Sequence, residues 1–142
     1  MYYVNREQIE RRLNILPELT QVLQAAVSAE EPSLVERFAE ERALHLAIEI
    51  VTDVGSYLID GFIMRDASSY EDIVDIILDE KVIEADLHAV LRTLVGLRKP
   101  LVQEYFDWDR SGEHEMAKSL PQALERFARG VRAYLDKEGI RS

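Results

Sequence analysis

Cysteine is absent from the 142 residues, so disulfide bonds, thiolate zinc sites and cysteine nucleophiles are all excluded. A chain without cysteine fits a reducing compartment, and we expect the protein in the cytoplasm. The first residues lack the basic start and apolar run of a secretory signal, and no later segment approaches about 18 uncharged apolar residues. We therefore expect a soluble protein with no targeting segment and no membrane contact.

Positive charge is also scarce, because 17 Lys and Arg residues face 27 Asp and Glu residues, for a formal net charge of −10. So acidic a chain has no whole-surface attraction to nucleic acid, and any contact with RNA must depend on a local patch. A basic partner is the simpler electrostatic expectation. The 47% of hydrophobic residues indicate a globular protein, and the length predicts a single domain over residues 1–142.

Ligand-binding signatures are few. The six glycines are scattered, so no glycine-rich phosphate loop is present. Glu41, His45 and Glu49 are spaced four residues apart and share one helix face, and Glu84 and His88 repeat that interval. Di-iron bundles instead space glutamate and histidine three apart on paired helices. We therefore expect no metal and no cofactor, and structural or solvated roles for these side chains.

What the sequence has in abundance is apolar residues at helical spacing. The first predicted helix covers roughly residues 5 to 27, with Asn5 and Gln8 spaced as a capping box and a kink at Pro17. The second runs from Leu34 to Phe62. Its apolar residues occupy more than one face, which predicts a central helix, or one between a core and a partner subunit.

Three further helices follow. Ser68 or Ser69 is predicted to cap a short acidic helix, Asp86 a fourth that ends near Leu97, and the last helix ends at Gly139. His114, which precedes this last helix and lies between two glutamates, is expected in solvent. No strand alternation or internal repeat is visible. The sequence therefore predicts an all-α, antiparallel up-and-down bundle of about five helices.

The segment after the fourth predicted helix, residues 97–106 (LRKPLVQEYF), departs from this regular pattern. Pro100 removes a backbone donor and disfavours helix at Lys99, so we expect a break or kink there. The break exposes backbone groups beside Arg98 and Lys99, and the planar guanidinium of arginine suits phosphate oxygens. If the segment continues as a helix, Phe106 can face the core.

Two interpretations of this segment remain open from the residues alone. In the functional one, Gln103 and Tyr105 are displayed beside Arg98 as a working site. In the structural one, Arg98 pairs with Glu104 or Asp107, and Tyr105 is a packed aromatic with a solvated hydroxyl.

Two stretches resemble the HepT-like branch of the HEPN families. Residues 41–49, ERALHLAIE, are similar to the family's ERALQLAIE helix, and residues 96–105, GLRKPLVQEY, are similar to its GFRNxLVHEY segment. The likeness covers roughly residues 30 to 136. It implies a helical bundle that forms a homodimer and brings two copies of the motif into one cleft.

The resemblance also implies a function. Members of the family act as toxins that cleave RNA without a metal, and each is paired with a small nucleotidyltransferase-like antitoxin that adds AMP to the tyrosine of the motif. By position, Arg98 is the motif's arginine and Tyr105 the tyrosine that the partner modifies. Arg98 and its neighbour Lys99 are then the residues that hold the RNA phosphate.

Two positions depart from the family pattern: Gln103 stands where the motif has histidine, and Lys99 stands where it has asparagine. Cleavage through the 2′-hydroxyl needs a group that exchanges a proton near neutral pH, which imidazole does and a carboxamide cannot do. Such steps are worth about a hundred to ten thousandfold in rate. The sequence predicts a feeble ribonuclease or, alternatively, a non-catalytic dimeric module that binds a nucleotidyltransferase-like partner.

Overall fold

Helices make up all the regular structure that the computed structural model describes, which is residues 2–112 and 114–141. The expected all-α fold class is confirmed, with α1 and α2 as the two parts of the first predicted helix. No helix among the described residues is long and apolar enough to cross a membrane. The helices are α1 (Arg6–Leu13), α2 (Leu16–Ser28), α3 (Leu34–Gly61), α4 (Tyr70–Asp79), α5 (Ala85–Gly96), the π-helical turn η1 (Lys99–Gln103), the 3-10 turn η2 (Tyr105–Asp107) and α6 (Met116–Lys137).

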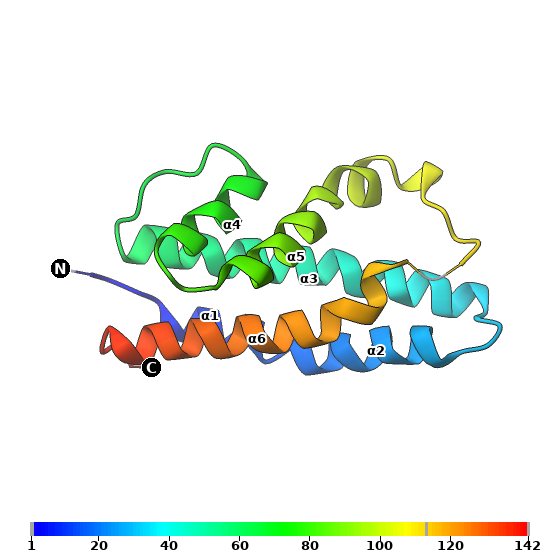
Figure 1. Cartoon of the computed structure of the whole chain (residues 1–142), viewed down its shortest axis with the longest axis horizontal. Helices are drawn as coiled ribbons and strands as arrows, with labels where there is room; N and C mark the ends of the chain where they lie inside the picture. Colours follow the sequence, from blue (N-terminus) through cyan, green and yellow to red (C-terminus); the bar gives the residue numbers. More distant parts are fainter. Residues whose placement is uncertain (1, 113, 142) are drawn as a thin grey trace.

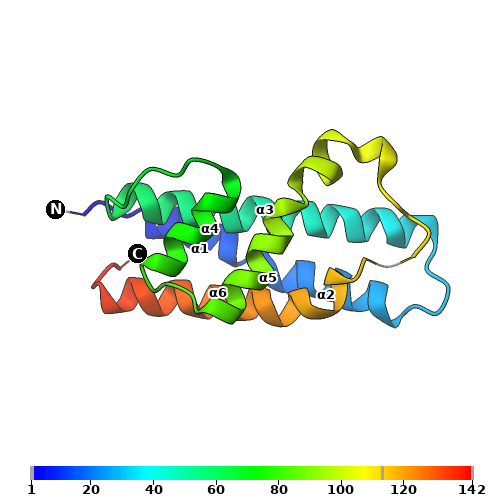
Figure 2. The same cartoon turned by 45° about the horizontal axis from the view of Figure 1, so that its top comes forward.

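The helices form an elongated bundle in which α2, α3 and α6 follow the long axis (Figure 1). α2 packs against both α3 and α6, while α4 and α5 pack against each other and against α3. The two ends of the chain lie at the same end of the bundle (Figure 1). In both views the segment between α5 and α6 projects over the N-terminal half of α3 (Figures 1 and 2).

The first predicted helix is divided in two. Asn5 caps α1 as expected, because its side chain accepts a hydrogen bond from the backbone N–H of Gln8 at 3.2 Å. The chain then breaks at residues 14–15, and Pro17 falls in the first turn of α2. Inside one continuous helix its ring would crowd the carbonyl of Leu13, whereas a first turn accommodates proline without loss. The predicted kink is therefore a full break.

Other helix ends follow local sequence signals, with one exception. Ser69 caps α4 by accepting the backbone N–H of Asp72 at 3.1 Å, and Gly139 adopts a positive φ of 75° just beyond α6. The prediction that Asp86 caps α5 is wrong. Asp86 lies in the first turn of α5, and its carboxylate binds the guanidinium of Arg126 on α6 at 2.8 and 2.9 Å.

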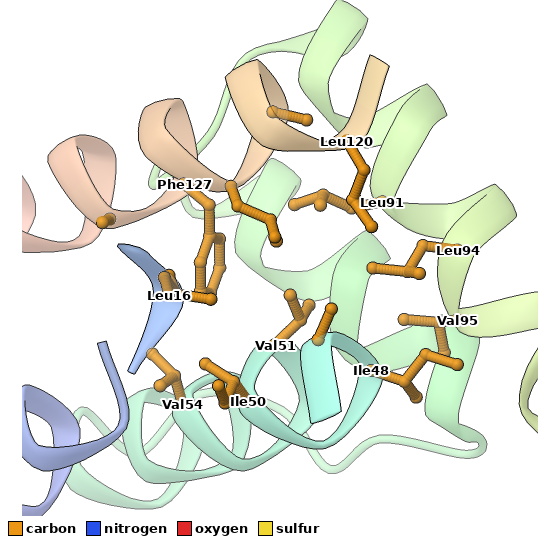
Figure 3. Close-up of a cluster of buried hydrophobic side chains, with 14 of the residues drawn as sticks. Leu16, Ile48, Ile50, Val51, Val54, Leu91, Leu94, Val95, Leu120 and Phe127 are labelled. Carbon is orange, nitrogen blue, oxygen red and sulfur yellow. The ribbon is translucent and has the colours of Figure 1, made fainter. Parts of the chain in front are cut away.

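The core lies where α2, α3, α5 and α6 meet (Figure 3). α3 buries residues on more than one face, as its sequence predicts, because it lies between α2 on one side and α4 and α5 on the other. Each fully buried aliphatic or aromatic side chain contributes about 1.5–3 kcal/mol. This packing fixes α5 against α3 and so determines where the segment after α5 begins. The central side chains include Leu16, Ile48, Val51, Leu91, Leu94, Leu120 and Phe127.

Candidate functional site

The segment that joins α5 to α6, residues 97–112, is here called the bend. Its first turn is π-helical, since the backbone N–H of Glu104 donates to the carbonyl of Lys99, five residues earlier, at 3.0 Å. Pro100 has no N–H, and its ring would clash with the carbonyl of Gly96 in a regular α-helix, so a wider turn relieves both problems. The predicted break at Pro100 is confirmed. Single π-turns of this kind occur often at functional sites.

The bend displays most of the residues singled out from the sequence. Lys99 and Gln103 are exposed, Tyr105 is 54% exposed, and only Arg98 is partly buried. The Tyr105 ring meets the ring of Phe106 edge-on, with centroids 5.6 Å apart. Phe106 is 71% exposed, so the expectation that it faces the core is wrong, because the π-turn and the following 3-10 turn rotate it outward.

Arg98 is held by two groups from other helices. Its Nε lies 3.8 Å from Oε1 of Glu49 on α3, and its guanidinium carbon lies 4.2 Å from the ring centre of Tyr70 on α4. The ion pair expected in the structural interpretation, with Glu104 or Asp107, is therefore not the one that forms. The Nε atom is buried and has no hydrogen-bond partner among the described residues. A buried donor of this kind calls for an explanation, and a functional role is one.

Glu49 also binds a histidine. Nε2 of His45 lies 3.5 Å from the same Oε1 atom, and Nδ1 of His45 lies 3.3 Å from Nη1 of Arg42. Arg42, His45 and Glu49 thus form a row along α3 whose far end contacts Arg98. The helix face predicted to hold His45 and Glu49 thus contacts Arg98. Among the described residues, no group of three or more His, Cys, Asp or Glu side chains is arranged to hold a metal ion.

A second attachment ties the bend to α3. Arg110 binds both carboxylate oxygens of Glu41, with Nη2 at 3.0 Å from Oε2, and its Nη2 also donates to the carbonyl of Tyr105 at 3.2 Å. The guanidinium carbon lies 4.5 Å from the ring centre of Phe38. The backbone at Tyr105 is therefore fixed while its ring stays exposed.

His114 provides a third attachment. Its backbone N–H donates to Oε1 of Glu40, a residue that is 2% exposed, and its Nδ1 accepts the backbone N–H of Met116 at 3.1 Å. Its ring stacks on Trp108 with centroids 5.3 Å apart. The expectation that His114 is merely solvated is wrong, because it satisfies a backbone donor at the start of α6.

Two residues of this site were not foreseen as partners of Arg98. The spacing of His45 and Glu49 on one face was visible in the sequence, but the contact of Glu49 with Arg98 crosses between α3 and the bend. Tyr70 had no sequence signal beyond its place at the start of a predicted helix. No hydrogen bond joins Arg98, Gln103 and Tyr105 to one another within the described part of the chain.

Comparisons with known proteins bear on this site. The family model described as "Ribonuclease HepT-like" matches residues 7–131. The Bacillus subtilis (strain 168) protein "Putative RNase YutE" is 37% identical over 138 residues, which are 97% of this chain and 94% of that protein.

Two kinds of solved structure share the fold. The structure of YutE, described as a cytosolic protein of unknown function from Bacillus subtilis, matches with a TM-score of 0.89 at 37% identity and covers 97% of this chain and 95% of that one. A crystal structure of a mutant toxin–antitoxin complex, MntA-HpeT, gives a TM-score of 0.74 at 14% identity, with 88% of this chain and 97% of that one covered. The latter likeness is one of fold alone.

Proposed function

This chain belongs to the HepT-like ribonuclease family, and from that premise we propose that it is the RNA-cleaving toxin of a toxin–antitoxin pair in the cytoplasm. The observation that carries the proposal is the state of Arg98. It is held against Glu49 and Tyr70 at the start of a π-turn, and its buried Nε is left without a hydrogen-bond partner among the described residues. The Arg98 side chain as a whole is 26% exposed, and the exposed part of its guanidinium is suited to an RNA phosphate.

The surroundings support a local RNA-binding patch on an acidic protein. Arg42 and Lys99 are exposed. Lys99 is the chain neighbour of Arg98, and Arg42 stands at the other end of the row on α3 that Arg98 contacts. Gln103 is exposed on the same turn, where its carboxamide orients a hydroxyl or a phosphate oxygen. Because these contacts involve charged groups and phosphate, we expect binding to weaken with salt.

We also propose that the activity of the toxin is controlled by modification of Tyr105. A nucleotidyltransferase-like antitoxin transfers AMP to Tyr105: the phenol oxygen attacks the α-phosphorus of ATP, the bond to the β-phosphate breaks, pyrophosphate leaves, and the phenol proton passes to solvent. The exposure of Tyr105 supports this role, as does the fixing of its backbone by Arg110. We further propose that two copies of the chain form a homodimer with their bends facing one cleft.

Intact-mass measurement after incubation with the cognate nucleotidyltransferase and magnesium ATP tests this assignment. The wild-type chain should gain one AMP, and Tyr105→Phe should gain none. Tyr3→Phe is the matched control, because Tyr3 is 86% exposed at the other end of the sequence, and it should still be modified. A wild-type mass that does not change would count against the proposal.

A second candidate function is favoured by one observation, the carboxamide of Gln103 at the motif's histidine position. In this alternative the chain is a non-catalytic dimeric module that only binds the nucleotidyltransferase-like partner. RNA cleavage in the presence of EDTA, compared between the wild type and Gln103→His, separates the two. Cleavage by the wild type supports the toxin, and cleavage gained only with the new histidine supports the module.

A further inference from the structure

We propose that His45 is a catalytic residue of this site, and that it accepts the proton of the RNA 2′-hydroxyl. The inference rests on the proposed ribonuclease function and names a group that the motif itself does not contain. An imidazole on α3 can supply the proton transfer that a carboxamide on the bend cannot. Three observations carry the inference: the contact that His45 shares with Arg98, its place between the two points at which the bend is held, and the groups that face its two ring nitrogens.

The first observation is the link between His45 and Arg98. Both side chains approach the same oxygen of Glu49, Nε2 of His45 at 3.5 Å and Nε of Arg98 at 3.8 Å. One carboxylate therefore keeps the imidazole next to the residue proposed to hold the phosphate. The side chain of His45 is 29% exposed, so it is neither buried in the core nor fully in solvent.

A second link places His45 alongside the rest of the bend. Glu41, one helical turn before His45, binds Arg110, which donates to the carbonyl of Tyr105. The bend thus contacts α3 one turn on either side of His45, through Arg98 at Glu49 and through Arg110 at Glu41. The bend projects over this half of α3 in both views (Figures 1 and 2). His45 therefore lies between the two points on α3 at which the bend is held.

The third observation is the pair of groups that face the ring nitrogens, from which we infer the tautomer. A guanidinium group only donates hydrogen bonds, so Nδ1 of His45, which faces Nη1 of Arg42 at 3.3 Å, is the acceptor and carries the lone pair. Nε2 then carries the hydrogen, with Oε1 of Glu49 lying 3.5 Å away. Arg42 is exposed, and its side chain can leave Nδ1 to bind an RNA phosphate. This movement would open Nδ1 to the substrate.

The chemical step follows from this arrangement. Nδ1 of His45 takes the 2′-hydroxyl proton while the 2′-oxygen forms a bond to phosphorus and the bond from phosphorus to the 5′-oxygen breaks. The departing 5′-oxygen takes a proton from water, and the hydroxide left behind removes the proton from His45. The products are a 2′,3′-cyclic phosphate and a 5′-hydroxyl. The negative charge of Glu49, 3.5 Å from Nε2, stabilises the transient imidazolium.

Steady-state cleavage of a mixed-sequence, single-stranded RNA oligonucleotide in EDTA tests the role of His45. We expect His45→Gln to lower kcat by about 10²–10⁴-fold with KM little changed, because the substitution removes proton transfer and leaves the phosphate contacts. His88→Gln is the matched control, since His88 binds Asp75 between α4 and α5, and it should cleave like the wild type. An oligonucleotide of the same sequence with 2′-deoxy sugars should remain intact.

The double variant His45→Gln/Gln103→His shows whether a loss of cleavage in His45→Gln comes from misfolding. If it recovers cleavage, the fold and the RNA contacts are intact and the missing element was an imidazole, which supports the inference. Full activity in His45→Gln would overturn the inference and leave the ribonuclease proposal standing. A wild type that is inert while Gln103→His cleaves would overturn it in favour of the binding module, and a chain inert in both forms would reject cleavage altogether.

Discussion

Two clusters in this protein each join a histidine, a carboxylate and an arginine, and they differ in how closely the three groups approach. In the cluster between α4 and α5, Oδ1 of Asp75 lies 2.6 Å from Nε2 of His88 and 3.1 Å from Nε of Arg92. The hydrogen bond from His88, and further the hydrogen bond and charge of Arg92, hold the pKa of Asp75 below its usual value. His88 and Arg92 thus both bind the carboxylate of Asp75, and these contacts join α5 to α4.

The cluster between α3 and the bend is open by comparison. Oε1 of Glu49 is 3.5 Å from His45 and 3.8 Å from Arg98, and neither distance is that of a good hydrogen bond. The Nε atom of Arg98 is buried without a hydrogen-bond partner among the described residues. The comparison teaches that the same three residue types form a network of short hydrogen bonds in one place and, in the other, a looser one held by longer charge contacts.

The largest expected difference between the two clusters is in the rate of RNA cleavage. We expect Glu49→Gln to lower kcat for RNA cleavage by about a hundredfold, because the uncharged amide neither stabilises an imidazolium nor keeps Arg98 oriented. Asp75→Asn, the same change in the closed cluster, should leave kcat unaltered. The measurement is cleavage of the RNA oligonucleotide by both variants in parallel, and equal losses in the two would erase the distinction.

How far the sequence predicts the fold depends on whether a feature is local. The cap of α4 and the break at Pro100 depend on residues a few positions apart. The sequence narrowed the cap to Ser68 or Ser69, of which Ser69 is the one used, and it predicted the break. Asp86 also had the local signature of a cap, yet its carboxylate binds Arg126, 40 residues away, a choice that only the packing of α5 on α6 decides. Local rules fail where a tertiary partner competes for the same side chain.

The candidate site shows the same division. The break at Pro100 could be predicted from sequence, because proline removes a backbone donor, whereas the sequence left open whether Tyr105 is displayed or packed. The partners of Arg98 could not be, since Glu49 and Tyr70 come from two helices whose approach depends on the whole core. His45 was visible only as a possible structural or metal-binding residue, and its relation to the bend appears once α3 and the bend are packed together.

The next largest expected effect is on stability. Here the substitution of Asp75 should have the larger effect and that of Glu49 the smaller one, the reverse of their order in catalysis. Asp75→Ala leaves His88 and Arg92 without their shared acceptor, and we expect it to cost about 1 kcal/mol at neutral pH, a figure reduced by the partial exposure of the carboxylate. Glu49→Ala should cost less, because its contacts are longer. Urea denaturation followed by circular dichroism compares the two free energies of unfolding.

The contribution of Asp75 also has a definite sign with pH. Because its pKa is lowered in the folded protein, the stabilisation is fully present above the unfolded pKa of about 4 and is lost as the pH falls through the folded value. The free energies of unfolding of the wild type and of Asp75→Asn should therefore converge in acid. A gap that stayed constant down to the acid limit would mean that the ionised carboxylate is not the source of the stability.

The smallest expected effect is on the KM for RNA, and it comes from the contact between Tyr70 and Arg98. The ring of Tyr70 lies 4.2 Å from the guanidinium carbon of Arg98, a contact worth about 0.5–1 kcal/mol at a partly exposed site. Tyr70→Leu should raise the KM for RNA by about two- to fivefold with kcat nearly unchanged, because Arg98 loses a support and no proton is affected. Tyr57→Leu is the matched control: its ring lies 5.0 Å from the guanidinium carbon of Arg12, and its removal should leave KM as it is. A KM that responds equally to both variants would mean that general loosening of the bundle, rather than the positioning of Arg98, governs the binding of RNA.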